Sequence, residues 1–152
     1  MMCENRRDVK LYNVIFPFWM IMLFPITWLV VLPGNFIIDS LVLYIGMKIL
    51  NIESKKIWYK KHIFKIFCFG LLADAIGAAF MLLMMIGFQI DYGEYEFYLT
   101  IPALILSSIF IFIFNYYVTF RKADKNIRLR MALLFAIVTA PYTFLVPLSW
   151  MY

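Results

Sequence analysis

Five apolar runs, separated by short polar or charged segments, constrain this chain more than any other feature of its sequence. They cover residues 11–32, 35–51, 64–90, 99–120 and 131–150. As a helix, a run of about 20 apolar residues crosses the hydrocarbon layer of a bilayer, which is roughly 30 Å thick. Only 15% of the residues are charged, against about 25% in an average soluble domain. We therefore predict an all-α integral membrane protein, folded as one bundle of five transmembrane helices over residues 1–152.

The boundary between the first two runs is marked by Leu32-Pro33-Gly34-Asn35, a sequence typical of a turn. We expect a tight turn there and a new helix after it, with Asn35 at the capping position. The first run is longer than the apolar segment of a signal peptide, and no small-residue cleavage site follows it. We therefore expect it to remain as a span.

The distribution of basic residues predicts the orientation of the bundle. Lys and Arg accumulate in short cytoplasmic loops, and five spans with a cytoplasmic N-terminus place all 14 of them on that side or at its interface. They lie in residues 6–10, 48–65 and 121–130, whereas the hydrophilic loop at 91–96 has only acidic charges and falls outside. If residues 35–51 did not cross, the first two basic clusters would lie on opposite sides. We therefore expect the N-terminus in the cytoplasm and the C-terminus outside.

Asp74 is the ionisable residue that is hardest to accommodate, because it lies well inside the run 64–90. An ionised side chain at the centre of a span costs at least about 2.5 kcal/mol on insertion scales, so it needs a structural or a functional reason. Helical spacing places it among small residues that let two helices approach closely. They are Gly70, Ala73, Gly77 and Ala78. We expect this helix-packing face to make the third span the central helix of the bundle.

Depth matching in an antiparallel bundle suggests partners for Asp74. Thr139 in the fifth run lies at a similar depth, and Asn115 in the fourth lies about one turn closer to the cytoplasm. Pro141 cannot donate a backbone hydrogen bond, which leaves the carbonyl of Ile137 available to another donor. A protonated Asp74 bonded to Thr139 or to that carbonyl would form a structural clasp. The alternative is a carboxyl group that handles a proton or a cation.

Asp39 also allows two interpretations. In a helix that begins at Asn35, it lies in or just beyond the first turn, where the helix dipole stabilises an anion near the membrane surface. The other interpretation is a site for a cation or a proton. The antiparallel arrangement predicts that Asp39 faces residues 81–84, roughly 10–15 Å from Asp74 along the membrane normal. That distance is too large for a catalytic pair of carboxylates.

The most basic segment, residues 54–65, mixes lysines with apolar and aromatic side chains. We expect anionic lipid head groups to bind at Lys55, Lys56, Lys60 and Lys61, and the alternative is a purely topological role of these charges. The net charge of +5 does not indicate nucleic-acid binding, because the charges lie in short clusters between apolar runs.

No group of residues in the sequence predicts catalysis, a metal site or a cofactor. His62 is the single histidine, whereas metalloprotease and diiron sites need several ligands. Neither a nucleotide-binding motif nor a nucleophile elbow occurs. A membrane-embedded enzyme acting on lipid is therefore the least supported class.

Two non-enzymatic functions remain. The first is a partner or subunit of a membrane complex, which would contact another membrane protein or a second copy of itself. The alternative is a small oligomeric transporter or channel that couples to a proton or a cation through an intramembrane Asp. The abundance of Ile, Lys, Phe, Tyr and Met is typical of an AT-rich genome, so we expect a multi-pass protein of a bacterial cytoplasmic (plasma) membrane.

Overall fold

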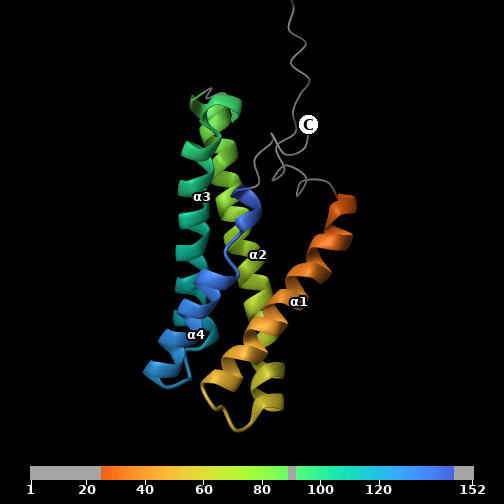
Figure 1. The fold of residues 1–152 in the computed structure, drawn as a ribbon, viewed down its shortest axis with the longest axis vertical. Helices are drawn as coiled ribbons and strands as arrows, with labels where there is room; N and C mark the ends of the chain where they lie inside the picture. Colours follow the sequence, from red (N-terminus) through yellow and green to blue (C-terminus); the bar gives the residue numbers. More distant parts are fainter. Residues whose placement is uncertain (1–24, 89–91, 146–152) are drawn as a thin grey trace, which may run out of the picture.

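The computed structural model describes residues 25–88 and 92–145 as helices joined by short loops (Figure 1). No strand occurs among these residues, which confirms the predicted all-α class. Within the described residues, three stretches are long and apolar enough to cross a bilayer. They are Trp28–Ile49, Lys55–Gly87 and Tyr98–Thr119. Only 22%, 28% and 33% of these apolar segments is buried inside the protein, which is compatible with lipid as the solvent of the rest.

The first helix, α1 (Pro25–Ile49), runs without interruption through the expected turn. Pro33 lies inside the helix, so the predicted turn and the predicted helix start at Asn35 are wrong. In lipid, breaking a helix leaves backbone groups without partners, and a helix therefore continues past a Pro-Gly pair that would end it in water. The 25 residues of α1 extend over about 37 Å, the length of one span. Residues 11–24 of the first predicted span lie outside the described part of the chain.

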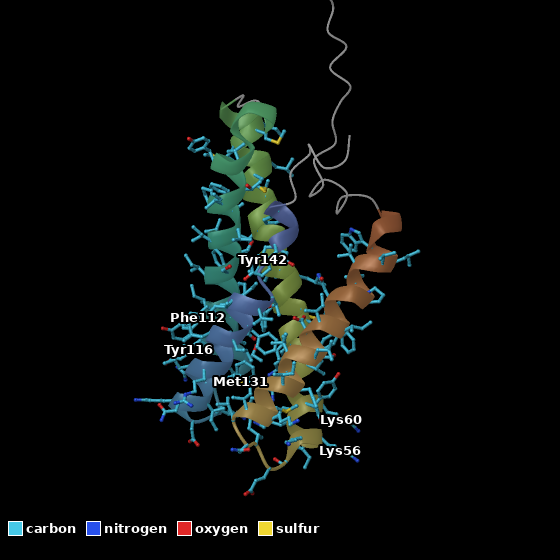
Figure 2. The ribbon with its side chains drawn as sticks, viewed as in Figure 1. Lys56, Lys60, Phe112, Tyr116, Met131 and Tyr142 are labelled. Atoms are coloured by element: carbon cyan, nitrogen blue, oxygen red, sulfur yellow. The ribbon has the colours of Figure 1, made fainter. Side chains whose placement is uncertain are left out.

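The second helix, α2 (Lys55–Phe88), has 34 residues and extends over about 51 Å, well beyond a hydrocarbon layer of roughly 30 Å. It begins earlier than the span expected at 64–90, because the basic segment is helical rather than a loop. The side chains of Lys56 and Lys60 project from the lower end of this helix, away from the other helices (Figure 2). The additional length thus carries the charged residues beyond the apolar part of α2.

The third helix, α3 (Tyr92–Phe114), continues directly into a short π-helix, η2 (Asn115–Thr119), and the two together contain most of the span predicted at 99–120. The last predicted span, 131–150, is broken. α4 (Lys125–Val138) has only 14 residues, and a 3-10 helix, η3 (Tyr142–Leu145), follows after the break. Pro141 explains the break, because proline lacks the N–H that a continuing helix requires. Residues 146–150 lie outside the described part of the chain.

Both basic segments lie at the same end of the bundle, as the charge pattern predicts. α1 leads to this end and α2 leaves it, and α3 returns to it before α4 begins (Figure 1). Trp58, near the start of α2, stacks on Phe120, which follows η2, with the ring centroids 5.3 Å apart. We call this the basic end of the bundle.

At the basic end, four helical segments share one apolar core, and we call this part the closed half. Its fully buried side chains come from α1, α2, α4 and the lower part of α3 with η2 and the residue after it. They are Leu43, Met47, Ile66, Ala73, Ile111, Phe120, Met131 and Phe135. The helices approach closely here, because a Cβ added at Gly46 of α1 would lie 2.7 Å from Sδ of Met131 in α4.

At the other end, a smaller core joins α2, α3 and η3, and we call this part the open half. Its buried side chains are Met81, Leu99, Ala103 and Phe144. Among the described residues, α1 contributes none of them, and Figure 1 shows α1 diverging from α2 in this direction. The first turns of α1 accordingly expose large apolar side chains, with Leu29 and Val30 each 76% exposed.

Candidate functional site

The small residues of α2, predicted to form one packing face, are divided between two neighbouring helices. The hydroxyl of Ser107 in α3 donates a hydrogen bond to the carbonyl of Ala73 over 3.0 Å. A Cβ added at Gly77 would overlap Oγ of Ser107, so this glycine permits the close approach of α2 and α3. Gly70 faces α1 instead. α2 therefore packs against α1 on one side and against α3 on the other.

Asp39 lies opposite Gly70, not opposite residues 81–84 as the sequence predicts. Its Oδ2 is 3.7 Å from the position that a Cβ at Gly70 would take. Asp74 lies one turn further along α2 than Gly70, so the two carboxyl groups are neighbours where α1 meets α2. The depth prediction fails because α1 is continuous, which changes the register of Asp39 against α2.

The dipole interpretation of Asp39 fails for the same reason. Asp39 lies in the interior of α1 and not in its first turn, whereas the helix dipole acts within the first and last turns. The side chain is 6% exposed. Asp39 is thus a buried carboxyl group between two apolar helices, and it needs another explanation.

Asp74 lies deep in the apolar part of α2. Counted from Lys65, the last lysine of the basic segment, it is about 14 Å along the helix, close to the middle of a hydrocarbon layer of roughly 30 Å. Its Oδ1 is buried and has no hydrogen-bond partner among the described residues. Buried polar atoms nearly always have a partner, and an exception requires an explanation.

The partners expected for Asp74 make other hydrogen bonds. The hydroxyl of Thr139 donates to the carbonyl of Phe135, four residues earlier on α4, over 2.8 Å. The amide of Asn115 donates to the carbonyl of Ile111 over 3.0 Å. The carbonyl of Ile137 does accept a hydrogen bond, as the position of Pro141 predicts, but the donor is the hydroxyl of Tyr142. The structure therefore brings Asp39 and Asp74 together and leaves Asn115 and Thr139 outside the pair.

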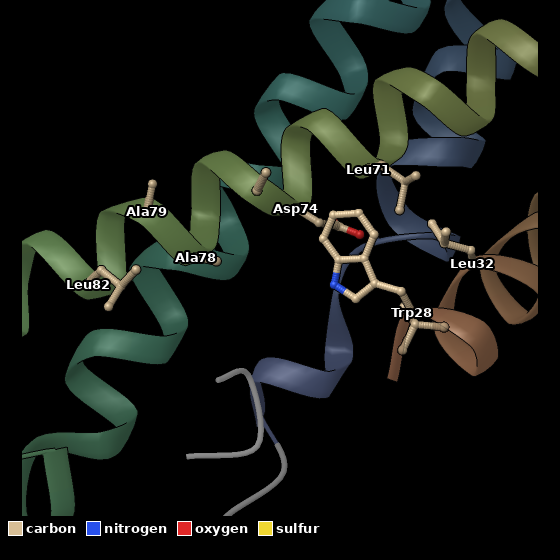
Figure 3. A pocket seen from close by; sticks show the side chains of 9 residues that line it. Trp28, Leu32, Leu71, Asp74, Ala78, Ala79 and Leu82 are labelled. Atoms are coloured by element: carbon tan, nitrogen blue, oxygen red, sulfur yellow. The ribbon is translucent and has the colours of Figure 1, made fainter. Parts of the chain in front are cut away.

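Asp74 also lines a cleft of about 330 Å³ between α1 and α2. Trp28 and Leu32 point into this cleft from α1, opposite Leu71 and Asp74 of α2 (Figure 3). Alanines at positions 75, 78 and 79 leave the space that larger side chains would fill. Asp74 is the one ionisable residue among those that line the cleft. The arrangement is an apolar cavity with a single carboxyl group in its wall.

The α1 side of this cleft was not predicted from the sequence. The turn expected at Pro33 placed Trp28 and Leu32 on a different helix from Asp39. In a continuous helix the spacing of these three residues puts them on one face. Extending the helical pattern across Pro33 would have revealed that Asp39 continues the stripe that lines the cleft.

The single histidine belongs to an aromatic cluster at the basic end. His62 is 5% exposed, its Nδ1 donates to the carbonyl of Trp58 over 2.8 Å, and its ring contacts those of Trp58 and Phe120. The neighbouring hydroxyl of Tyr59 donates to Oγ of Ser40 over 2.8 Å and ties α2 to α1. These contacts give His62 a packing role in the closed half.

Within residues 25–88 and 92–145, no group of three or more His, Cys, Asp or Glu residues is arranged to hold a metal ion. Comparisons of the chain with protein-family models, with curated proteins and with solved structures find no match. The carboxyl pair and the adjoining cleft are therefore the observations from which a function can be argued.

Proposed function

We propose that this chain is a non-enzymatic, multi-pass protein of a bacterial cytoplasmic membrane that transports a proton or a cation on its carboxyl pair, Asp39 and Asp74. The proposal rests on one observation: two carboxyl groups lie together inside the bundle. The sequence has no Lys or Arg between residues 66 and 120 to neutralise them. Like charges in an apolar interior repel each other, so at least one of the two must take up a proton or a cation.

This proposal favours the small transporter or channel over the partner subunit. A carboxyl group that serves only packing is expected to have a hydrogen-bond partner, and Oδ1 of Asp74 has none among the described residues. A site that binds and releases a cation needs an oxygen that is available to that cation. A transporter or channel of this kind is expected to form its pathway as an oligomer.

A second candidate function is supported by the open half. α1 diverges from α2 there (Figure 1) and presents Leu29 and Val30 on its surface. A transmembrane helix of another protein, or a second copy of this chain, would cover these side chains. This candidate predicts a complex of fixed stoichiometry that survives purification in mild detergent, and no ion flux from the isolated chain.

The orientation is part of the proposal. We place the basic end in the cytoplasm, where Lys55, Lys56, Lys60 and Lys61 contact anionic lipid head groups. Support comes from the two basic segments at one end of the bundle and from the exposure of these lysines. The five-span arrangement, with the N-terminus inside and the C-terminus outside, requires one crossing before α1 and takes the broken α4–η3 segment as the last crossing.

Native Cys3 offers a direct test of this topology. A membrane-impermeant maleimide is applied to intact spheroplasts that express the Cys68→Ser variant. Five spans predict that Cys3 is labelled only after the cells are broken. Labelling of intact cells would show that the N-terminus lies outside and would contradict the five-span arrangement.

The transport proposal is tested with the purified chain in liposomes that contain a pH-sensitive dye. Under a potassium diffusion potential, and in exchange against sodium or potassium, we expect wild-type flux and at least a tenfold loss in Asp39→Asn and Asp74→Asn. The matched control is Asp124→Asn, because Asp124 is exposed at the start of α4 and its side chain makes no capping hydrogen bond. Equal flux in wild type and a correctly folded Asp74→Asn variant would overturn the proposal.

A further inference from the structure

We propose that the cleft between α1 and α2 binds a hydrophobic organic cation, an amine with a compact apolar body, whose ammonium group pairs with Asp74. This inference rests on the proposed function and names the substrate class of the same site. It arises from the combination of an apolar cavity, a carboxyl oxygen without a partner among residues 25–88 and 92–145, and the absence of a basic residue at that depth.

The shape of the cleft fits a small molecule. Its volume of about 330 Å³ lies at the lower end of the range for ligand pockets, about 300–1,000 Å³. Its walls are apolar on both helices, with Val31 and Leu32 on α1 and Leu71 and Leu82 on α2. Such walls favour a ligand with a compact hydrocarbon body, and apart from Asp74 they offer no side-chain oxygen that could replace the water around a hydrated inorganic ion.

The charge of the cleft indicates a cation. Asp74 is the one ionisable residue among the described residues that line the cleft, and Asp39 lies one helical turn away, opposite Gly70. The chain has no Lys or Arg in residues 11–47, 66–120 or 131–152. Neither this chain nor a second copy can therefore bring a basic side chain to that depth. A positive charge in the cleft would therefore come from a different molecule. An ammonium group also supplies N–H donors to the carboxyl group of Asp74, whose Oδ1 has no hydrogen-bond partner among the described residues.

The cleft is open at its edge. The lining residues Trp28, Ala75 and Ala79 are all exposed on the protein surface, and α1 diverges from α2 toward this side (Figure 1). A hydrophobic amine dissolved in the bilayer can reach Asp74 laterally, between the two helices, without passing through the closed half. The site is thus built for a ligand that partitions into lipid.

The test compares two molecules with the same body. Radiolabelled 1-aminoadamantane and 1-adamantanol are dialysed against lipid nanodiscs with and without the full-length chain, and binding to empty nanodiscs is subtracted. We expect saturable binding of one amine per site, and at least tenfold weaker binding of the alcohol. Binding of the amine should weaken as the pH falls and the carboxyl groups are protonated, whereas that of the alcohol should not change.

Three variants locate the site. Asp74→Asn should weaken amine binding at least tenfold, and Asp124→Asn should leave it unchanged. Ala79→Leu adds bulk at the exposed edge of the cleft and keeps both carboxyl groups, so it should also weaken amine binding even if Asp74→Asn proves poorly folded. Amine binding that is insensitive to Ala79→Leu, or equal binding of the amine and the alcohol, would overturn the inference.

The outcome separates this inference from the proposed function. If the amine does not bind but wild-type liposomes show a flux that Asp74→Asn abolishes, the carboxyl pair carries a proton or an inorganic cation and the substrate class proposed here is wrong. If binding and flux are both absent, both proposals are wrong. Amine binding together with amine-driven proton movement supports both.

Discussion

The closed and the open half of the bundle use the same helix, α2, in opposite ways. At the basic end, large side chains such as Phe120 and Phe135 fill the space between the helices, and both are completely buried. In the open half, α2 presents alanines toward α1, and the space remains as a cleft. The difference shows that the closed half specifies one packing arrangement, whereas the open half retains a cavity next to a carboxyl group.

The contrast also separates the two sides of α2. Toward α3 the contact is close along both halves, through Gly77 and the Ser107 hydrogen bond to Ala73. Toward α1 the contact is close only in the closed half. The carboxyl pair lies at the junction of the two halves, with Asp39 on the buried side and Asp74 on the cleft side. A cation bound to the pair would couple the packing of the two halves.

The largest expected effect concerns the closed half. Phe135→Ala removes a fully buried ring and should lower the free energy of unfolding by about 3–5 kcal/mol. Leu29→Ala in the open half is the control, because Leu29 is 76% exposed and its loss should cost less than about 0.5 kcal/mol. Reversible unfolding in mixed micelles measures both values. Similar losses in the two variants would remove the distinction between the halves.

A smaller effect is expected on the α3 side of α2. In Gly77→Ala the new Cβ would overlap Oγ of Ser107 and lie 2.9 Å from the ring of Phe144, so the variant should lose about 1–3 kcal/mol. Gly34→Ala is the matched control, since no atom lies within 4 Å of its added Cβ, and it should be neutral or gain up to about 1 kcal/mol. The same unfolding experiment applies. A neutral Gly77→Ala would contradict the close contact of α2 with α3.

The smallest effect on stability is expected at Asp74. Because its Oδ1 has no partner among the described residues, Asp74→Leu and Asp74→Asn should both stay within about 1 kcal/mol of the wild type. A structural clasp predicts a different result, in which Asn is stable and Leu loses more than about 2 kcal/mol. That second result would restore the clasp interpretation and remove the reason to assign Asp74 a function.

Much of the fold could be predicted from local sequence properties. Apolar runs and charged segments give the helical class, the long helix around Asp74 and the common end of the two basic segments. The break after α4 was not among the predicted features, because an uninterrupted span was expected at 131–150. The predicted features depend on the composition of short stretches of the chain, which can be read from the sequence without knowing how the helices pack.

The site could not be predicted to the same extent, because it depends on the register between helices. In water, the Pro33-Gly34 pair would predict a turn, because the backbone groups exposed by the turn form hydrogen bonds to solvent. In lipid such a break is costly, and α1 continues. That one difference moves Asp39 from the level of residues 81–84 to the level of Gly70, and it turns two separate carboxyl groups into a pair.

The central claim, that Asp39 lies beside Gly70 in a continuous α1, is tested most directly by cross-linking in membranes. In a background of Cys3→Ser and Cys68→Ser, Asp39→Cys is combined with either Gly70→Cys or Met84→Cys and oxidised, and the linked peptides are identified by mass spectrometry. We predict rapid disulfide formation with position 70 and none with position 84. Cross-linking to position 84 in place of position 70 would contradict the register of α1 and the carboxyl pair derived from it.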